Sequence, residues 1–82
     1  MTTEIYSQIK LVLAEQADLS KDVSGLHIDD DLFAAGMSSR ATVGVMLGLE
    51  SAFDIEFPDA MLRRDVFESI RSIGDALVTL QN

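Results

Sequence analysis

Residues 36–59 read GMSSRATVGVMLGLESAFDIEFPD, and this stretch decides the fold. Between Ser39 and Phe53 its apolar residues recur every three or four positions, which is the spacing of an amphipathic helix. The Phe57-Pro58 pair then breaks the helix, because proline lacks a backbone donor and clashes with the preceding turn. We therefore predict a helix over residues 39–53 that ends before this pair.

Two apolar stripes of this helix compete for the core. The first ends in a carboxylate, and its members are Val43, Met46, Leu47 and Glu50. The second is apolar to its end, and its members are Val45, Met46, Leu49 and Phe53. Burying an unpaired carboxylate is costly, so we predict that the second stripe faces the core. Phe53 then becomes a core anchor, and Val43 and Leu47 face outward.

Two further segments have helical periodicity, one on each side of this helix. Residues 4–17 form the first, with Thr3 as the N-cap and an apolar stripe of Ile5, Ile9, Val12 and Leu13. Residues 70–80 form the last, with Ser69 as the N-cap and an inward stripe of Ile70, Ile73, Leu77 and Leu80. Residues 59–68 are expected to hold a short turn or two of helix.

Residues 18–38 read as a long loop, and a loop of this length in a small domain is typically functional. Four apolar residues are expected to pin it to the core: Leu26, Ile28, Leu32 and Phe33. No segment alternates in the manner of a strand. The sequence therefore predicts an all-α fold, a small bundle of three to four helices with a long first loop, as a single domain over residues 1–82.

The composition disfavours several classes of function. The 82-residue chain is 48% hydrophobic, which argues against disorder, and it has no cysteine for a disulfide or a cysteine-based metal site. Fourteen acids against six Lys and Arg give a net charge of −8. This charge disfavours nucleic acid and anionic membranes, and it favours either basic protein partners or solubility alone. No signal peptide or membrane-length apolar segment is visible, so we expect a cytoplasmic monomer.

Few side chains suggest catalysis or metal binding. His27 is the single histidine and has no Asp or Cys at ligand spacing. The run Asp29-Asp30-Asp31 lacks the spaced oxygen ligands of an EF-hand, so a solvated acidic loop is favoured. The Arg63-Arg64 pair is too short a basic patch for nucleic acid. We predict no metal site and no catalytic residues, and hence no enzyme.

Four short motifs, taken in order, resemble those of the acyl and peptidyl carrier protein family. They are Gly36 three residues before Ser39, followed by residues 49–53, 55–59 and 67–70. The resemblance covers residues 5–80. It implies that Ser39 receives 4′-phosphopantetheine in a phosphodiester bond, which makes the chain a phosphoprotein. It also implies that the terminal thiol of this arm carries cargo as a thioester.

Two adjacent serines compete for this attachment. Ser39 lies three residues after Gly36 and six before Val45, which matches the family register. Ser38 then stands where the family usually has Asp, and Arg40 where it usually has Leu. The unpaired N–H groups and positive dipole end of a helix N-terminus favour an attached phosphate. The alternative is an ordinary N-cap with no modification.

The predicted outer side of the helix is unusually free of acids for this family, whose members often array acids there. Its exposed residues are Arg40, Val43, Gly44, Leu47 and Gly48, and they form the predicted partner-binding surface. Two explanations of the glycines stay open: close approach by a partner, or packing against the loop or a neighbouring helix. The smooth surface is similar to that of stand-alone aminoacyl carrier proteins served by ligases related to aminoacyl-tRNA synthetases.

The resemblance thus implies a carrier protein that presents an acyl or aminoacyl thioester to partner enzymes, with the aminoacyl cargo favoured. The implied partners are a phosphopantetheinyl transferase, an acyl- or aminoacyl-activating ligase, and downstream acyl-transfer enzymes. One alternative is a small helical protein-interaction module with the carrier fold but no prosthetic group. Another is a regulatory subunit that docks a helix into the groove between Val43 and Leu47.

Overall fold

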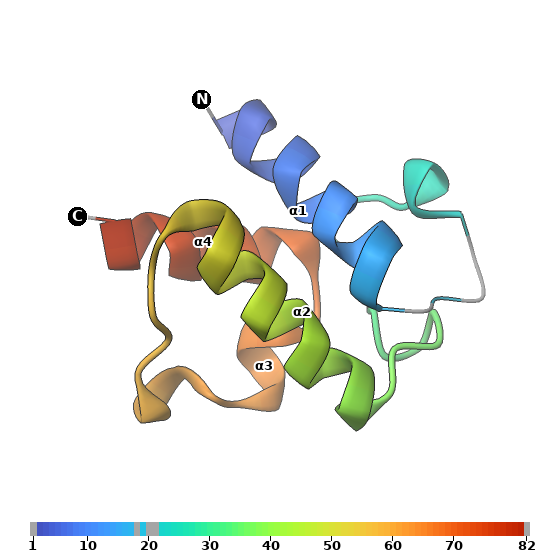
Figure 1. Ribbon diagram of the computed structural model, residues 1–82. Coiled ribbons are helices and arrows are strands. Elements are labelled where there is room, and N and C mark those ends of the chain that lie inside the picture. Colours follow the sequence, from blue (N-terminus) through green and yellow to red (C-terminus); the bar gives the residue numbers. More distant parts are fainter. Residues whose placement is uncertain (1, 18, 20–21, 82) are drawn as a thin grey trace.

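The computed structural model describes residues 2–17, 19 and 22–81, and these residues form an all-helical fold (Figure 1). The elements in chain order are α1 (Thr2–Gln16), η1 (Val23–Gly25), α2 (Ser39–Phe53), η2 (Asp59–Met61), α3 (Arg64–Phe67) and α4 (Ile70–Gln81). No strand occurs in this described part of the chain. The predicted all-α class is therefore confirmed, with three long helices and the one-turn α3. The predicted N-cap Thr3 is wrong, because α1 already begins at Thr2.

The core lies where α1 meets both α2 and α4, and α3 packs against α4 (Figure 1). The three long helices and the first loop each contribute fully buried side chains. These are Ile9, Leu13, Leu32, Val45, Leu49, Ile70, Ile73 and Leu77. The predicted inward stripe of α4 is confirmed, with Leu80 half-buried at its end. The predicted cap of α4 is also confirmed, since the Ser72 N–H donates to Ser69 Oγ at 3.0 Å.

The choice of stripe on α2 is confirmed for its centre and wrong for its end. Val45 and Leu49 are fully buried, whereas Val43 and Leu47 are 53% and 56% exposed. Phe53 is only half-buried, so it is not the predicted core anchor. The helix ends at Phe53 and the chain turns at once.

Phe57, and not the end of α2, fills the place in the core that was predicted for Phe53. Its ring is 5% exposed, and its centroid lies 5.3 Å from that of Phe67. Asp54 turns the chain with a left-handed backbone, at φ 53°. The Phe57 N–H then donates to Glu50 Oε2 at 2.9 Å. The one acid within α2 is therefore a structural group that fastens the turn after the helix.

The first loop is fastened to the start of α4. The Leu32 N–H donates to the carbonyl oxygen of Glu68 at 2.7 Å, and the Arg71 N–H donates to that of Ile28 at 2.9 Å. Leu26 and Leu32 are buried, while Ile28 and Phe33 pack against the core from its edge. The predicted pinning of the loop is confirmed, and the pinned loop delivers the chain to the N-terminus of α2.

The predicted acidic run stabilises this loop from within. Asp30 Oδ2 accepts from the His27 N–H, and Asp31 Oδ1 accepts from the Phe33 and Ala34 N–H groups. Asp29 forms a two-point ion pair with the Arg71 guanidinium, whose second contact is 3.1 Å. Each carboxylate is therefore engaged by a group of the protein, and within the described residues no three His, Cys, Asp or Glu side chains gather at a metal-binding distance.

The Asp29–Arg71 pair predicts a small acid sensitivity. The hydrogen bond from Arg71 lowers the pKa of Asp29 below its ordinary 3.8. A lowered folded-state pKa means that the stabilisation is present above pH 3.8 and is lost as the pH falls through the lowered value. We expect Asp29→Asn to melt below the wild type near neutral pH and the gap to close in acid. Melting curves across this range check it; a gap that is constant with pH would contradict it.

Candidate functional site

The two serines at the start of α2 have different structural roles. Ser38 is the N-cap: its backbone is extended, its Oγ accepts from the Ala41 N–H at 3.0 Å, and its carbonyl oxygen accepts from the Thr42 N–H at 2.9 Å. Ser39 is the first residue of the helix and is exposed. Its hydroxyl makes no hydrogen bond within the described residues. Ser38 is thus committed to structure, and Ser39 presents a hydroxyl that is available for chemistry.

The approach to the pair explains the spacing from Gly36. Gly36 has φ 115°, in the region that favours glycine because a side chain there is strained. Met37 follows with 3% exposure, and its N–H donates to the carbonyl oxygen of Leu32 at 3.0 Å. The chain therefore turns at Gly36, is anchored at Met37, and then exposes the two serines.

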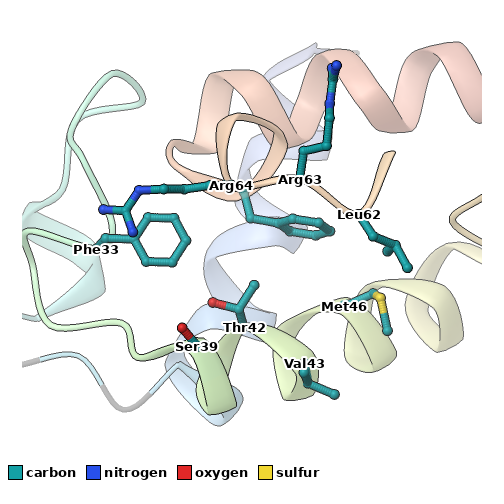
Figure 2. A pocket seen from close by; sticks show the side chains of 9 residues that line it. Phe33, Ser39, Thr42, Val43, Met46, Leu62, Arg63 and Arg64 are labelled. Atoms are coloured by element: carbon teal, nitrogen blue, oxygen red, sulfur yellow. The ribbon is translucent and has the colours of Figure 1, made fainter. Parts of the chain in front are cut away.

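A cavity of about 320 Å³ opens beside Ser39 between α2, the η2–α3 segment and the first loop (Figure 2). Its lining residues are Phe33, Ser39, Thr42, Val43, Met46, Leu62, Arg63, Arg64 and Phe67. The wall is apolar apart from two hydroxyls and two arginines. An exposed hydroxyl beside a cavity of this kind fits an elongated group attached through a phosphate.

The two arginines of the cavity differ in what they contact. The Arg64 guanidinium carbon lies 4.1 Å from the centroid of the Phe33 ring, which is a cation–π contact. Arg63 Nε lies 3.3 Å from Asp65 Oδ1, and both of these side chains are well exposed. The sequence suggests only a short basic patch at this arginine pair and does not predict its contact with the first loop. Phe33 and Arg64 stand thirty-one positions apart, and no periodicity in the sequence brings them together.

Four of the five predicted partner-binding residues border one of two hollows on the surface. Arg40, Val43 and Leu47 are exposed, but Val43 lines the cavity beside Ser39, and Leu47 borders a shallow depression shared with α1. Exposed Leu62 lies across that cavity from Val43. Contact of these residues with a partner stays a prediction.

The two glycines of α2 lie against α1. A Cβ at Gly48 would stand 2.8 Å from Val12 Cγ1, and one at Gly44 would stand 3.1 Å from Gln16 Oε1. Valine is stiff at χ1, so Val12 has little freedom to withdraw. Of the two explanations left open by the sequence, packing against a neighbouring helix is the one that the structure shows. A partner contact at Gly44 or Gly48 stays a prediction.

A family model and several known proteins match most of this chain. A family model described as a phosphopantetheine attachment site matches residues 7–77. The aminoacyl carrier protein of Agrobacterium fabrum is 48% identical over 69 residues, which cover 84% of this chain and 83% of that protein. The D-alanyl carrier protein of Streptococcus thermophilus is 38% identical over 63 residues, covering 76% and 78%.

Carrier proteins in solved structures are also similar to this chain. One similar chain comes from a crystal structure of an engineered Bradyrhizobium japonicum glycine:[carrier protein] ligase complexed with a carrier protein from Agrobacterium tumefaciens and ATP. It is 44% identical, with a TM-score of 0.89 and coverage of 92% of this chain and 97% of that one. In a complex of the ligase with glycylated carrier protein, a chain at 25% identity still gives a TM-score of 0.69, covering 92% and 96%.

Proposed function

Because the chain belongs to the carrier protein family with a phosphopantetheine attachment site, we propose that it carries an aminoacyl group on an arm attached to Ser39. The cofactor of this family is covalent 4′-phosphopantetheine, whose terminal thiol holds the cargo as a thioester when it is bound. The chain itself has no cysteine, so the thiol must come from this group.

The observation that carries the choice of residue is the unequal use of the two serines. The hydroxyl oxygen of Ser38 already caps α2, whereas that of Ser39 is exposed beside the cavity. The N–H groups at the first turn of α2 point to the same end of the helix, and they favour the negative charge of a phosphodiester. Attachment at Ser39 therefore leaves the helix cap intact.

The partners follow from the same proposal. The relatives carry aminoacyl or D-alanyl groups by name, and similar chains occur in complexes with a glycine-activating ligase. We infer an aminoacyl-activating ligase as the loading enzyme, a phosphopantetheinyl transferase before it, and acyl-transfer enzymes after it. In this scheme the chain presents its cargo and catalyses no step. None of the helices in the described residues has the length and apolar character of a membrane span. A cytoplasmic location stays a prediction from the sequence.

Intact-protein mass spectrometry tests this function. The protein is co-produced with a phosphopantetheinyl transferase and then offered ATP and amino acids, including glycine and D-alanine, with candidate ligases. We expect one mass increase for the arm and a second for one aminoacyl group, which alkali or hydroxylamine removes as it would a thioester. A chain that never gains the arm would contradict the proposal and favour the interaction module without a prosthetic group.

Loading by the ligase should depend on packing at α2 more than on its one acid. Leu47 is 56% exposed at the middle of the helix, whereas Glu50 is occupied by the Phe57 N–H. We expect Leu47→Ala to lower kcat/KM for loading about tenfold, which corresponds to about 1.4 kcal/mol, and Glu50→Gln to change it little. Leu11→Ala is the matched control, because Leu11 is an exposed leucine on α1, at 66%.

The measurement is loading kinetics at low and high salt, with melting temperature recorded for each variant. Leu47 is preferred to Gly44 for this test, because a side chain at Gly44 would meet Gln16 and disturb the helix pair. Exposed charges are screened within about 10 Å at 0.1 M salt, so a packing-led interface responds weakly to salt. Loading that collapses with modest salt, or that depends more on Glu50 than on Leu47, would show an electrostatic interface instead.

A further inference from the structure

Positive charge gathers around Ser39 in a molecule that is otherwise acidic. The chain has six Lys and Arg against fourteen acids. Three of the six stand near this serine: Arg40 follows it in α2, and Arg63 and Arg64 line the cavity beside it. Arg63 is paired with Asp65, so within the described residues the positive charge near an anion at Ser39 that has no ion pair comes from Arg40 and Arg64, in spite of the net charge of −8. Composition alone does not explain this arrangement.

Arg64 is the arginine that is both held in place and unpaired. One face of its guanidinium lies on the Phe33 ring at 4.1 Å. No carboxylate in the described part of the chain forms an ion pair with it, whereas Arg63 is paired with Asp65. A guanidinium has five N–H donors in its plane, so stacking on a ring leaves the donors at its edge available. Such a planar fork matches the oxygens of a phosphate group.

The orientation of the side chains agrees with this assignment. Figure 2 shows the Ser39 hydroxyl on the side of α2 that faces Phe33 and Arg64, and Arg63 pointing away from α2. Thr42 lines the same cavity beside Ser39, but its hydroxyl already donates to the carbonyl oxygen of Ser38 at 2.9 Å. Arg64 is therefore the cationic donor that faces the attachment point across the cavity.

We propose that Arg64, held on Phe33, binds the phosphodiester of an arm attached to Ser39 and so fixes the base of the arm against α3. This inference rests on the proposed function, because it needs the arm at Ser39. The contact neutralises the charge that the arm adds to an already acidic protein. It also links the first loop, through Phe33, to the presence of the arm.

Phosphorus NMR of the arm-bearing protein tests the inference directly. We expect the wild-type phosphodiester to show slower local motion and a shifted resonance compared with Arg64→Gln, whose signal should resemble that of a freely mobile phosphodiester. Arg63→Gln is the matched control and should leave the signal unchanged, because Arg63 points away. At about 1 M salt, where screening acts within about 3 Å, the wild-type signal should move toward that of Arg64→Gln.

Melting of the proteins with and without the arm separates binding from simple packing. Loss of the contact with Phe33 should lower the melting temperature of Arg64→Gln in both forms. If Arg64 also binds the phosphate, the melting temperature of Arg64→Gln should fall further below that of wild type when the arm is attached. The change in melting temperature on attachment should therefore be less favourable in Arg64→Gln than in wild type. Arg64→Lys keeps the charge without the planar fork and should restore this difference only in part.

The outcomes distinguish the two proposals. Peptide mass mapping first locates the arm in each variant. If the arm is on Ser39 and the phosphorus signal is the same in wild type and Arg64→Gln, the role of Arg64 is wrong and the carrier function stands. If Arg63→Gln changes the signal as much as Arg64→Gln does, the effect is general charge and the specific site is wrong. If no arm is found on Ser39, both proposals are overturned.

Discussion

Ser39→Ala is expected to abolish attachment of the phosphopantetheine arm, while Ser38→Ala retains it. The reason is that the two serines differ in their hydrogen bonds. Ser38 Oγ accepts from the Ala41 N–H, whereas the Ser39 hydroxyl is exposed and makes no hydrogen bond within the described residues. Removing the only hydroxyl that is both exposed and free at this point leaves no nucleophile for the transferase. The effect on attachment should be all or none, and no aminoacyl group should be loaded afterwards.

The two variants should also differ in stability, because only Ser38→Ala is expected to be less stable than the wild type. Ser38→Ala removes an N-cap hydrogen bond and should cost about 1 kcal/mol, or roughly 4–8 °C of melting temperature in a domain of this size. Ser39→Ala breaks no hydrogen bond of the described structure and should melt close to the wild type. Each variant is thus the control for the other: one keeps the arm and loses stability, and the other does the reverse.

Intact mass after co-production with a transferase, followed by a digest that separates the two positions, checks this expectation. Circular dichroism of the same samples gives the melting temperatures. An arm found on Ser38 would show that the register is displaced by one residue. An arm retained by Ser39→Ala would show that the exposed hydroxyl is not the attachment point.

The start of α2 illustrates how far the sequence reaches. Helical periodicity was sufficient to place the beginning of the helix at about Ser39, and the spacing from Gly36, matched to the family register, selected Ser39 as the attachment residue. The spacing works because Gly36 adopts a positive φ that fixes where the loop ends. Which of the two serines caps the helix is a matter of backbone dihedrals and one hydrogen bond. The sequence offered two good capping residues, and the hydrogen bond from the Ala41 N–H shows that Ser38 is the cap.

Hydrophobic periodicity did not predict the contacts between residues that lie far apart in the sequence. The stack of Arg64 on Phe33 joins the first loop to α3, and both residues had other interpretations in the sequence. The glycines of α2 were equally ambiguous, because their reason lies on α1 at Val12 and Gln16. Periodicity reports which face of a helix is apolar. It does not report which neighbour approaches that face or how closely.

The end of α2 shows a third kind of limit. Helical spacing extended the inward stripe to Phe53, but the helix stops there and the following turn carries Phe57 into the core. The turn depends on the left-handed backbone of Asp54 and on the bond from the Phe57 N–H to Glu50. Both are local events that a periodic pattern does not describe.

Phe57→Ala is expected to lower the free energy of unfolding by about 3–5 kcal/mol, the range for truncating a buried phenylalanine. The ring is 5% exposed and packs at 5.3 Å on Phe67, which belongs to α3 beside the cavity. Small domains have about 5–15 kcal/mol of stability in total, so the loss is a large fraction of it. Attachment and loading should fall with the folded fraction, because the ring pair supports one wall of the site.

Phe53→Ala is the matched control, since it removes the same atoms four residues earlier. Phe53 is half-buried at the end of α2, so we expect a loss of about 1–2 kcal/mol. The backbone around Phe57 is held independently of its ring, by the bond to Glu50 and by Pro58, which keeps the preceding residue extended. Urea denaturation of the two variants therefore compares one buried ring with one half-buried ring. If the two variants lose equal free energy of unfolding, or if Phe53→Ala loses more, Phe53 is the core anchor and the role assigned to Phe57 is wrong.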